Sequence, residues 1–171
     1  QAGNRIADLT YHKDSDDWII KLPKKVTQNG KVVSEVNYDS KGRVTWAKQN
    51  GATVATLTYH TTGVQAGHVA TVKDAMNHTT TLADYYRGQP RLVTFADSTS
   101  VSRSIDYEGR TTSFTDAAGV TTGYEYNTQG WLTKIDRPAP WTDTTIAYIN
   151  IGTSNFYQLI RRGDSQYYNW Y

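Results

Sequence analysis

The chain has 171 residues and a mass of 19.2 kDa, which suits one domain or one repeat array rather than two domains. Its 18 basic and 16 acidic residues leave a net charge of +2, too small to indicate a nucleic-acid or membrane partner. The absence of cysteine excludes disulfide scaffolds, thiolate nucleophiles and cysteine-based zinc sites.

The composition favours an all-β fold. The chain contains 25 threonines, 13 tyrosines and 5 tryptophans but only 1 methionine, and threonine and tyrosine suit the half-buried surface of a sheet. No apolar run approaches the roughly 18–20 residues of a membrane span. Because the chain starts at Gln1, with neither an initiator methionine nor a signal peptide, we expect it to be a piece of a longer product.

Residues 1–27 are expected to form entry strands. An acidic turn with Asp14, Asp16 and Asp17 precedes Trp18 and the Leu-Pro stretch that follows it. This cluster lacks the glycine and the distal glutamate of a calcium-binding EF-hand loop, so we interpret it as a solvated turn. The four histidines show no zinc-site spacing and are interpreted as turn or surface residues: His12, His60, His68 and His78.

Residues 28–152 show a period of about 21 residues. Six glycines recur at intervals of 21 to 25: Gly42, Gly63, Gly88, Gly109, Gly130 and Gly152. The positions four residues earlier are tyrosine in four of the six cases: Tyr38, Tyr59, Asp84, Ile105, Tyr126 and Tyr148. Such a fixed period indicates about six structural repeats.

A second set of turn signals lies out of phase with these glycines. Asn-Gly dipeptides at 29–30 and 50–51 favour hairpin turns, and aspartate-led clusters follow near 74, 97, 116 and 136. Each period therefore holds two turns and two strands, and the alternation of Val36 and Tyr38 with Asn37 is typical of strands with one buried face. We predict a meander of about twelve short strands, with residues 153–171 starting a further repeat and a strand rather than a helix at 155–162.

The segment from Tyr38 to Thr45, with Asp39, Gly42 and Arg43, resembles the tyrosine–aspartate (YD) repeat of the rearrangement-hotspot (Rhs) proteins. Partial copies surround Gly109 with Arg110, and Gly130 with Tyr126. The Trp-Ile-Ile-Lys-Leu-Pro string that starts at Trp18 is similar to a stretch that precedes the repeats in that family. The resemblance covers residues from about 11 to 148. The arginine that follows the glycine is missing at Gly63, Gly88 and Gly152, and Gly130 is followed by a tryptophan.

This resemblance implies an all-β architecture, an antiparallel meander of YD-type hairpins that forms a strip of a spiralling β-sheet shell over residues 1–171. In similar proteins the shell commonly encloses a C-terminal toxin. The resemblance thus implies a non-enzymatic structural segment of a secreted or cell-surface bacterial protein, delivered by a secretion system, without cofactor or metal. The Asp-Pro-x-Gly string of the family's self-cleavage motif is absent from this chain.

Two further hypotheses belong to different functional classes. Open sheet edges favour pairing with flanking repeats or with copies of the chain, which would suit a self-assembling surface fibre or adhesin. A carbohydrate-binding module would use exposed tryptophans as stacking platforms, with Trp18, Trp46 and Trp131 as candidates. No catalytic residue is assigned, because the aspartates follow the turn phases and no nucleophile elbow or phosphate loop is present.

Overall fold

The computed structural model describes residues 7–15, 19–150 and 156–170. Within these ranges the chain forms one short 3₁₀-helix, η1 (Gly63–Gln65), and fifteen strands. The strands are β1 (Ala7–Asp14), β2 (Ile19–Gln28), β3 (Lys31–Tyr38), β4 (Val44–Gln49), β5 (Ala52–Tyr59), β6 (Val69–Asp74), β7 (Thr79–Tyr86), β8 (Gln89–Thr94), β9 (Ser100–Ile105), β10 (Thr111–Thr115), β11 (Thr121–Tyr126), β12 (Leu132–Asp136), β13 (Thr144–Asn150), β14 (Phe156–Arg162) and β15 (Ser165–Trp170).

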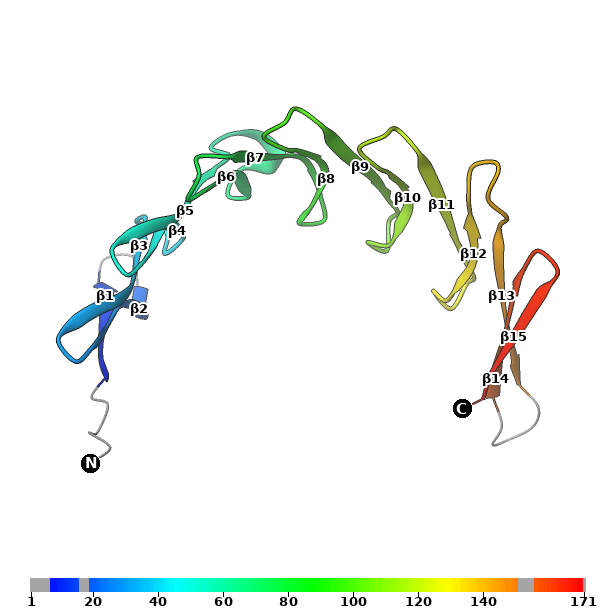
Figure 1. Cartoon of the computed structure of the whole chain (residues 1–171), viewed down its shortest axis with the longest axis horizontal. Helices are drawn as coiled ribbons and strands as arrows, with labels where there is room; N and C mark the ends of the chain where they lie inside the picture. The colour runs from blue at the N-terminus through cyan, green and yellow to red at the C-terminus, as the bar shows by residue number, and fades with distance from the viewer. Residues whose placement is uncertain (1–6, 16–18, 151–155, 171) are drawn as a thin grey trace. The chain divides into compact units, whose positions relative to one another are not determined.

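The hydrogen-bonded order of the strands is their order in the sequence, and they form one open sheet. Figure 1 shows β3 to β5 in the first unit and β10 to β12 in the second following one another across the sheet in chain order. This confirms the predicted all-β antiparallel meander. The prediction of about twelve strands was too low. It counted two strands for each of the six periods and left out strands at the two ends of the chain. The N-terminal segment adds the long strands β1 and β2, and β14 lies where the sequence favoured a strand.

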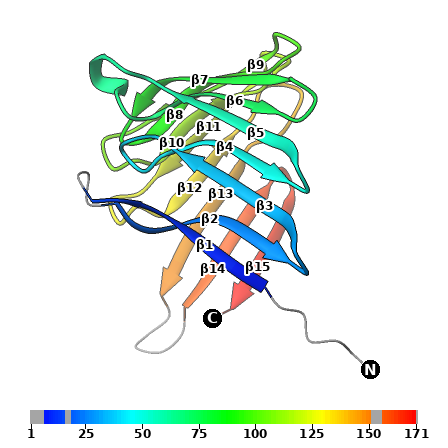
Figure 2. The same cartoon turned by 90° about the vertical axis from the view of Figure 1, so that its left-hand side faces the viewer.

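The chain divides into two compact units, one of residues 1–85 with 94–98 and one of residues 86–93 with 99–171. In the first unit β1 to β7 pair consecutively and antiparallel, as the neighbouring arrows of β2 to β5 show in Figure 2. In the second unit β9 to β15 pair in the same way.

A register shift directly precedes three of the repeat tyrosines. The shifts fall between residue pairs 37/38, 58/59 and 125/126, at the last residues of β3, β5 and β11. The extra residue of each bulge lies on the partner strand, β4, β6 or β12, opposite the tyrosine. Such an extra residue bends the strand that carries it and increases the local twist of the sheet.

The two faces of the first unit differ in polarity. Directly opposed residues share a face, so the register places Val36, Ala47 and Leu57 on the face of the repeat tyrosines, which we call the tyrosine face. The other face, which we call the threonine face, carries Thr58 and Thr71, whose hydroxyl oxygens lie 2.6 Å apart. This alternation follows directly from the period of two in the sequence.

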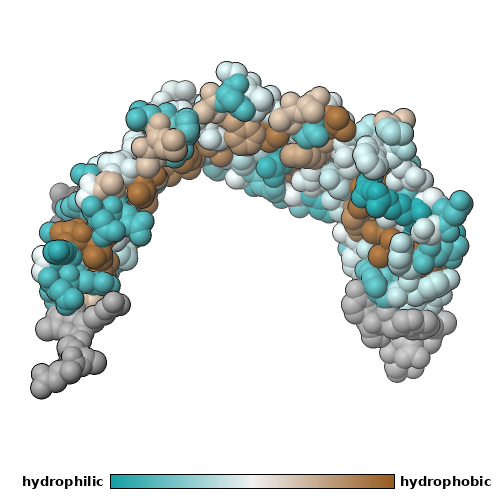
Figure 3. All heavy atoms as spheres, in the orientation of Figure 1, coloured by the Kyte–Doolittle hydropathy of each residue, from teal (hydrophilic) through white to brown (hydrophobic). Residues whose placement is uncertain are grey.

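A single layer of sheet leaves few side chains out of contact with solvent. Among the described residues only Ile105, Leu159 and Thr144 are buried. Large apolar side chains lie exposed, and Figure 3 shows hydrophobic patches beside hydrophilic ones on the surface of both units. No second layer supplies a core, so the sheet must be held together by contacts along its own strands and turns.

Candidate functional site

Five turns of the described chain share one hydrogen-bond pattern. In each, the N–H of the first residue donates to the carbonyl of the fifth, and the N–H of the fourth donates to the carbonyl of the first, at 2.9–3.2 Å. We call these the five-residue turns: Asp39–Arg43, Asp74–His78, Asp106–Arg110, Asp116–Val120 and Asn127–Trp131. The first side chain accepts backbone N–H groups of the same turn, as Asp39 Oδ1 does from Lys41 and Arg43 at 2.9 and 3.0 Å. The aspartates thus have a structural role at these positions.

Two of these turns carry an internal ion pair. Arg43 lies 2.6 Å from Asp39, and Arg110 lies 2.6 Å from Asp106. Desolvation is the largest influence on the pKa of each aspartate and raises it. The hydrogen bonds from the arginine side chain and the turn backbone together outweigh it, so both pKa values lie below the usual 3.8. Both carboxylates are therefore charged at neutral pH.

Each arginine also contacts the tyrosine of the next repeat. The guanidinium carbon of Arg43 lies 4.2 Å from the ring centroid of Tyr59, and that of Arg110 lies 4.7 Å from the ring centroid of Tyr126. A cation over an aromatic face is stabilised by the ring quadrupole. The turn of one repeat is thereby coupled to the strand of the next.

The tyrosine hydroxyl completes this connection by donating to a backbone carbonyl of the preceding strand. We call this unit, the ring with its hydroxyl hydrogen bond, the tyrosine clasp. It occurs five times among the described residues, with oxygen–oxygen distances of 2.7–2.9 Å: Tyr38 to Pro23, Tyr59 to Val44, Tyr85 to Val69, Tyr126 to Thr111 and Tyr148 to Leu132. The clasp recurs with the period of the sequence and gives the half-buried tyrosine a partner for its hydroxyl each time.

In four of the five clasps, the side chain on the tyrosine ring belongs to the residue that precedes the carbonyl acceptor: Arg43, His68, Arg110 and Trp131. In the remaining clasp the ring of Tyr38 faces His12 of β1, with centroids 5.7 Å apart. His68 stacks on Tyr85 with centroids 4.5 Å apart and an interplanar angle of 8°. Trp131 lies 4.8 Å from Tyr148, tilted by 47°. Arginine, histidine and tryptophan are all flat, so each can cover an aromatic face.

Burial raises the pKa of three clasp tyrosines above the usual 10.0: Tyr59, Tyr85 and Tyr126. The neutral phenol is the form that can donate to a carbonyl. These three clasps therefore keep their donors throughout the physiological pH range.

The signature positions taken from the sequence occupy different places in the structure. Gly42, Gly109 and Gly130 are the fourth residues of five-residue turns, with φ of 73°, 88° and 84°, a region that suits glycine. Gly63 instead begins η1, and Gly88 belongs to a two-residue turn with Arg87. Gly152 and Trp18 lie outside the described residues.

Sequence spacing misses parts of two repeats. It places Asp84 at a tyrosine position, whereas Tyr85, the next residue, forms the clasp. The sequence does hold a signal for the Tyr85 clasp. Two histidines bracket the longer loop at 60–68, and His68 holds the position that Arg43 and Arg110 hold in other repeats. In the next repeat Ile105 is buried at the tyrosine position. The neighbouring turns are joined there by Gln89 Nε2, which donates to the carbonyl of Gly109 at 2.9 Å.

The tryptophan candidates differ in exposure. Trp131 is 46% exposed and forms part of the Tyr148 clasp. Trp46 is half-buried on the threonine face, with the Lys48 ammonium 4.6 Å from its ring centroid.

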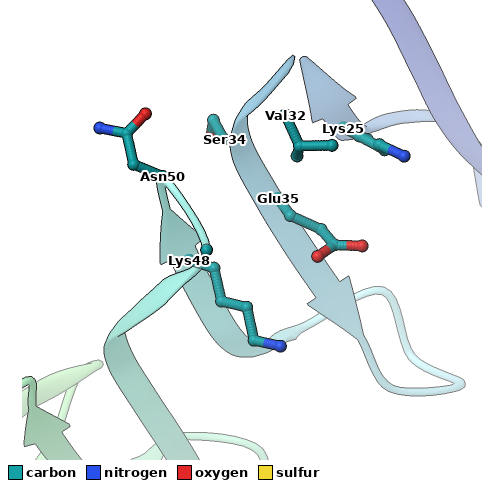
Figure 4. A pocket seen from close by; sticks show the side chains of 7 residues that line it. Lys25, Val32, Ser34, Glu35, Lys48 and Asn50 are labelled. Atoms are coloured by element: carbon teal, nitrogen blue, oxygen red, sulfur yellow. The ribbon is translucent and has the colours of Figure 1, made fainter. Parts of the chain in front are cut away.

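A hollow of about 340 Å³ opens beside β2, β3 and β4 and is lined in part by Lys25, Glu35 and Lys48. Figure 4 shows these three side chains leaving neighbouring strands on one side, with the carboxylate between the two ammonium groups. Lys25 opposes Glu35, and Glu35 opposes Lys48, in the strand register. The arrangement can bind charged or hydrogen-bonding groups.

The described residues contain neither a cluster of metal-ligating side chains nor a membrane-spanning helix. Across the part of the chain that the structure describes, no group of three or more histidine, aspartate or glutamate side chains is placed to hold a metal ion. The helical content described is confined to η1, and no helix there is long and apolar enough to span a bilayer.

Comparison with known proteins supports the repeat interpretation. The family model described as RHS Repeat matches residues 106–139, the segment with the Asp106 and Asn127 turns. No curated protein matches the chain.

Among solved structures, the chain is similar to a crystal structure of TcdB2-TccC3-Cdc42, with a TM-score of 0.61 and 13% identity over 86% of this chain. It is also similar to a structure of the Photorhabdus luminescens Tc holotoxin pore with a mutation in TccC3, with a TM-score of 0.61 and 13% identity over 95% of this chain. The chain spans 9% of the length of each of these two chains. At this identity the likeness establishes the fold, and together with the family match it shows that the chain contains a segment of YD/Rhs repeats.

Proposed function

We propose that the chain is a non-enzymatic structural segment of a YD/Rhs-repeat shell, secreted or displayed by a bacterium, that encloses a cargo such as a C-terminal toxin. The observation that carries this proposal is the tyrosine clasp, which occurs in five of the six repeats and couples each of these to the strand before it. Such nearest-neighbour coupling suits a long wall built by continuation of one sheet.

The lack of a second layer supports the same proposal. The described residues of each unit bury almost no side chain completely, although many large apolar groups are present. A sheet of this kind gains stability when its apolar face meets further protein. Flanking repeats and an enclosed cargo would both provide such a surface.

The test uses the native gene product that contains this sequence. Its intact mass and peptide map are expected to show further repeats of about 21 residues around this segment. Limited proteolysis is expected to spare the region enclosed by the repeats until denaturant opens the shell. The same region expressed without the repeats serves as the control and should be cleaved at once.

Two outcomes would overturn the proposal. A native chain without further repeats would favour the fibre or adhesin, in which copies pair through their sheet edges. A long repeat array whose following region is digested as fast as the control would exclude enclosure of a cargo.

A further inference from the structure

Two hairpin turns of the first unit are Asn-Gly pairs with similar backbone geometry. Asn29 and Gly30 join β2 to β3, and Asn50 and Gly51 join β4 to β5. The φ angles of the two asparagines are 50° and 48°, and those of the two glycines are 74° and 84°. A two-residue turn between antiparallel strands requires positive φ at both central residues, and Asn-Gly supplies it. Turn geometry therefore accounts for the presence of this residue pair at both places.

Both turns are open to water and have room to change conformation. All four residues are exposed. Figure 4 shows the Asn50 side chain with its amide directed away from Ser34 and Lys48. A side chain added at Gly30 or Gly51 would meet nothing within 4 Å, so the backbone there has space to rotate. Because glycine has no side chain, its own nitrogen is also unshielded and can approach the side-chain carbonyl of the preceding asparagine.

Three other asparagines of the described chain lack one of these features. Asn37 donates from Nδ2 to Thr45 Oγ1 at 2.9 Å, and Asn127 Oδ1 accepts two backbone N–H groups of its own turn. Asn77 is exposed and has a positive φ of 67°, but His78 follows it. The chain thus contains two asparagines with engaged side chains and one exposed turn asparagine without a following glycine.

We propose that Asn29-Gly30 and Asn50-Gly51 are sites of spontaneous deamidation, which converts each asparagine to a mixture of aspartate and isoaspartate. The glycine nitrogen attacks the side-chain carbonyl carbon and closes a five-membered succinimide ring. A proton passes from this nitrogen through water to the side-chain amide, which leaves as ammonia. Water then adds to one of the two ring carbonyls, and the ring opens to aspartate or isoaspartate without an oxidant or a reductant. The reaction is independent of the shell function.

The two products have different consequences for the sheet. Aspartate retains the turn, because Asp-Gly also suits two positive φ angles. Isoaspartate carries one more atom in the backbone, which does not fit a two-residue turn and disturbs the pairing of Gln49 with Ala52. At the second turn either product also adds a carboxylate to the hollow described above, where two lysines accompany one glutamate. The reaction there changes the net charge of the hollow from +1 to zero.

The test incubates the full native protein that contains this sequence in mildly alkaline buffer and follows it by peptide mapping. Each conversion raises the mass of its peptide by about 1 Da, because an amide becomes an acid. Isoaspartate is identified by methylation with an isoaspartyl methyltransferase. We expect the Asn29 and Asn50 peptides to convert about tenfold or more faster than the Asn77 peptide, because glycine leaves the attacking nitrogen unhindered. The Asn127 peptide is a second comparison and should remain unconverted over the same period.

Two variants test the role of glycine and the effect on the turn. His78→Gly places a glycine after Asn77 and should raise the conversion rate of Asn77 about tenfold. Asn50→Asp has the charge of the product but a normal backbone, so its midpoint of urea unfolding should match that of the unmodified protein. The isoaspartate fraction, separated by ion exchange, should unfold at lower urea.

Three results would overturn the inference. One is conversion of Asn77 as fast as that of Asn29 and Asn50, since glycine would then have no part in the reaction. Another is conversion of Asn29 and Asn50 in the urea-unfolded protein alone, because the folded turns would then hold the reacting atoms apart. An isoaspartate fraction as stable as Asn50→Asp would contradict the disturbance of the turn.

Discussion

The hydroxyl of each clasp tyrosine replaces water at a strand carbonyl that the ring itself covers. Tyr59 donates to Val44 at 2.8 Å, and Tyr126 donates to Thr111 at 2.8 Å. Removing one such donor costs the hydrogen bond and leaves the carbonyl without a partner under the ring. The clasp is therefore a small but repeated contribution to the stability of the sheet.

We expect Tyr59→Phe and Tyr126→Phe each to lower the free energy of unfolding by about 1 kcal/mol. Urea denaturation followed by circular dichroism measures the change. Tyr107→Phe is the control, because the Tyr107 side chain is 78% exposed, and it should leave stability within about 0.5 kcal/mol of the unmodified chain. Equal losses for all three variants would show that the clasp hydrogen bonds have no special role.

The turn aspartates make stability depend on pH in the acid range. Asp39 has a folded pKa below its usual 3.8, so its contribution is present above that value and is lost as pH falls through the folded pKa. The Asn127 turn shows that an amide oxygen can accept the same two backbone N–H groups, at 3.1 and 2.8 Å.

Asp39→Asn is therefore expected to keep the turn but to flatten the fall in stability below pH 4, whereas Asp39→Ala should destabilise the chain at all pH values. Thermal unfolding at several pH values between 2 and 7 measures both effects. The reverse change, Asn127→Asp, is the matched control and should steepen the acid response. If Asp39→Asn loses stability below pH 4 as steeply as the unmodified chain, the loss must come from other carboxylates.

At the level of single residues, the sequence predicts the turns well but predicts the tyrosine clasps only in part. Tyr38, Asp39, Gly42 and Arg43 are a strong local pattern because turn geometry demands those residue types. The clasp joins residues 15 or 16 positions apart, so a tyrosine can form it one position out of phase, as Tyr85 does. The bulges on the strands opposite three of these tyrosines leave no mark in the alternation of residues.

At the scale of whole elements, the contact between one turn and the next strand depends on shape and charge rather than on one residue type. Arg43, His68 and Trp131 hold the same position against Tyr59, Tyr85 and Tyr148 respectively. A side chain that packs on the tyrosine ring of one clasp should therefore be able to replace its counterpart in another clasp. This interchange is a direct test of the repeat as a structural unit.

We expect His68→Arg to preserve the stability of the chain, because arginine holds this place in two other clasps. His68→Ala should lower the free energy of unfolding by about 1 kcal/mol, since the stacked ring is lost. Val64→Ala in the same loop is the control, because Val64 is 92% exposed. A loss in His68→Arg as large as that in His68→Ala would mean that the histidine has a role of its own.

For the whole molecule, the sequence identifies the repeats but does not reveal that so few of their side chains are buried. Alternation along each strand predicts one buried face, yet only three described residues are buried. The reason is that burial of a face depends on what lies against it, and that partner is not encoded in the local pattern. Each repeat contributes strands and turns, and its neighbours contribute the contacts.

We therefore expect stability to grow with the number of repeats. Extending the chain by one native period of about 21 residues should raise the midpoint of thermal unfolding, because one more set of strand and clasp contacts is added. Extension by a Gly/Ser linker of the same length is the control and should leave the midpoint unchanged. A midpoint unaffected by native repeats would contradict nearest-neighbour stabilisation.

The loop from His60 to His68 has nine residues where the Asp39 turn has five, yet both close with the same bonds between their ends. His60 N–H donates to the His68 carbonyl at 2.9 Å, and Gly67 N–H donates to the His60 carbonyl at 2.9 Å. The four additional residues leave the register of β5 and β6 and the Tyr85 clasp in place. This edge of the sheet can thus accept inserted sequence, and an epitope tag placed between Thr62 and Gly63 should be displayed without altering the strands on either side.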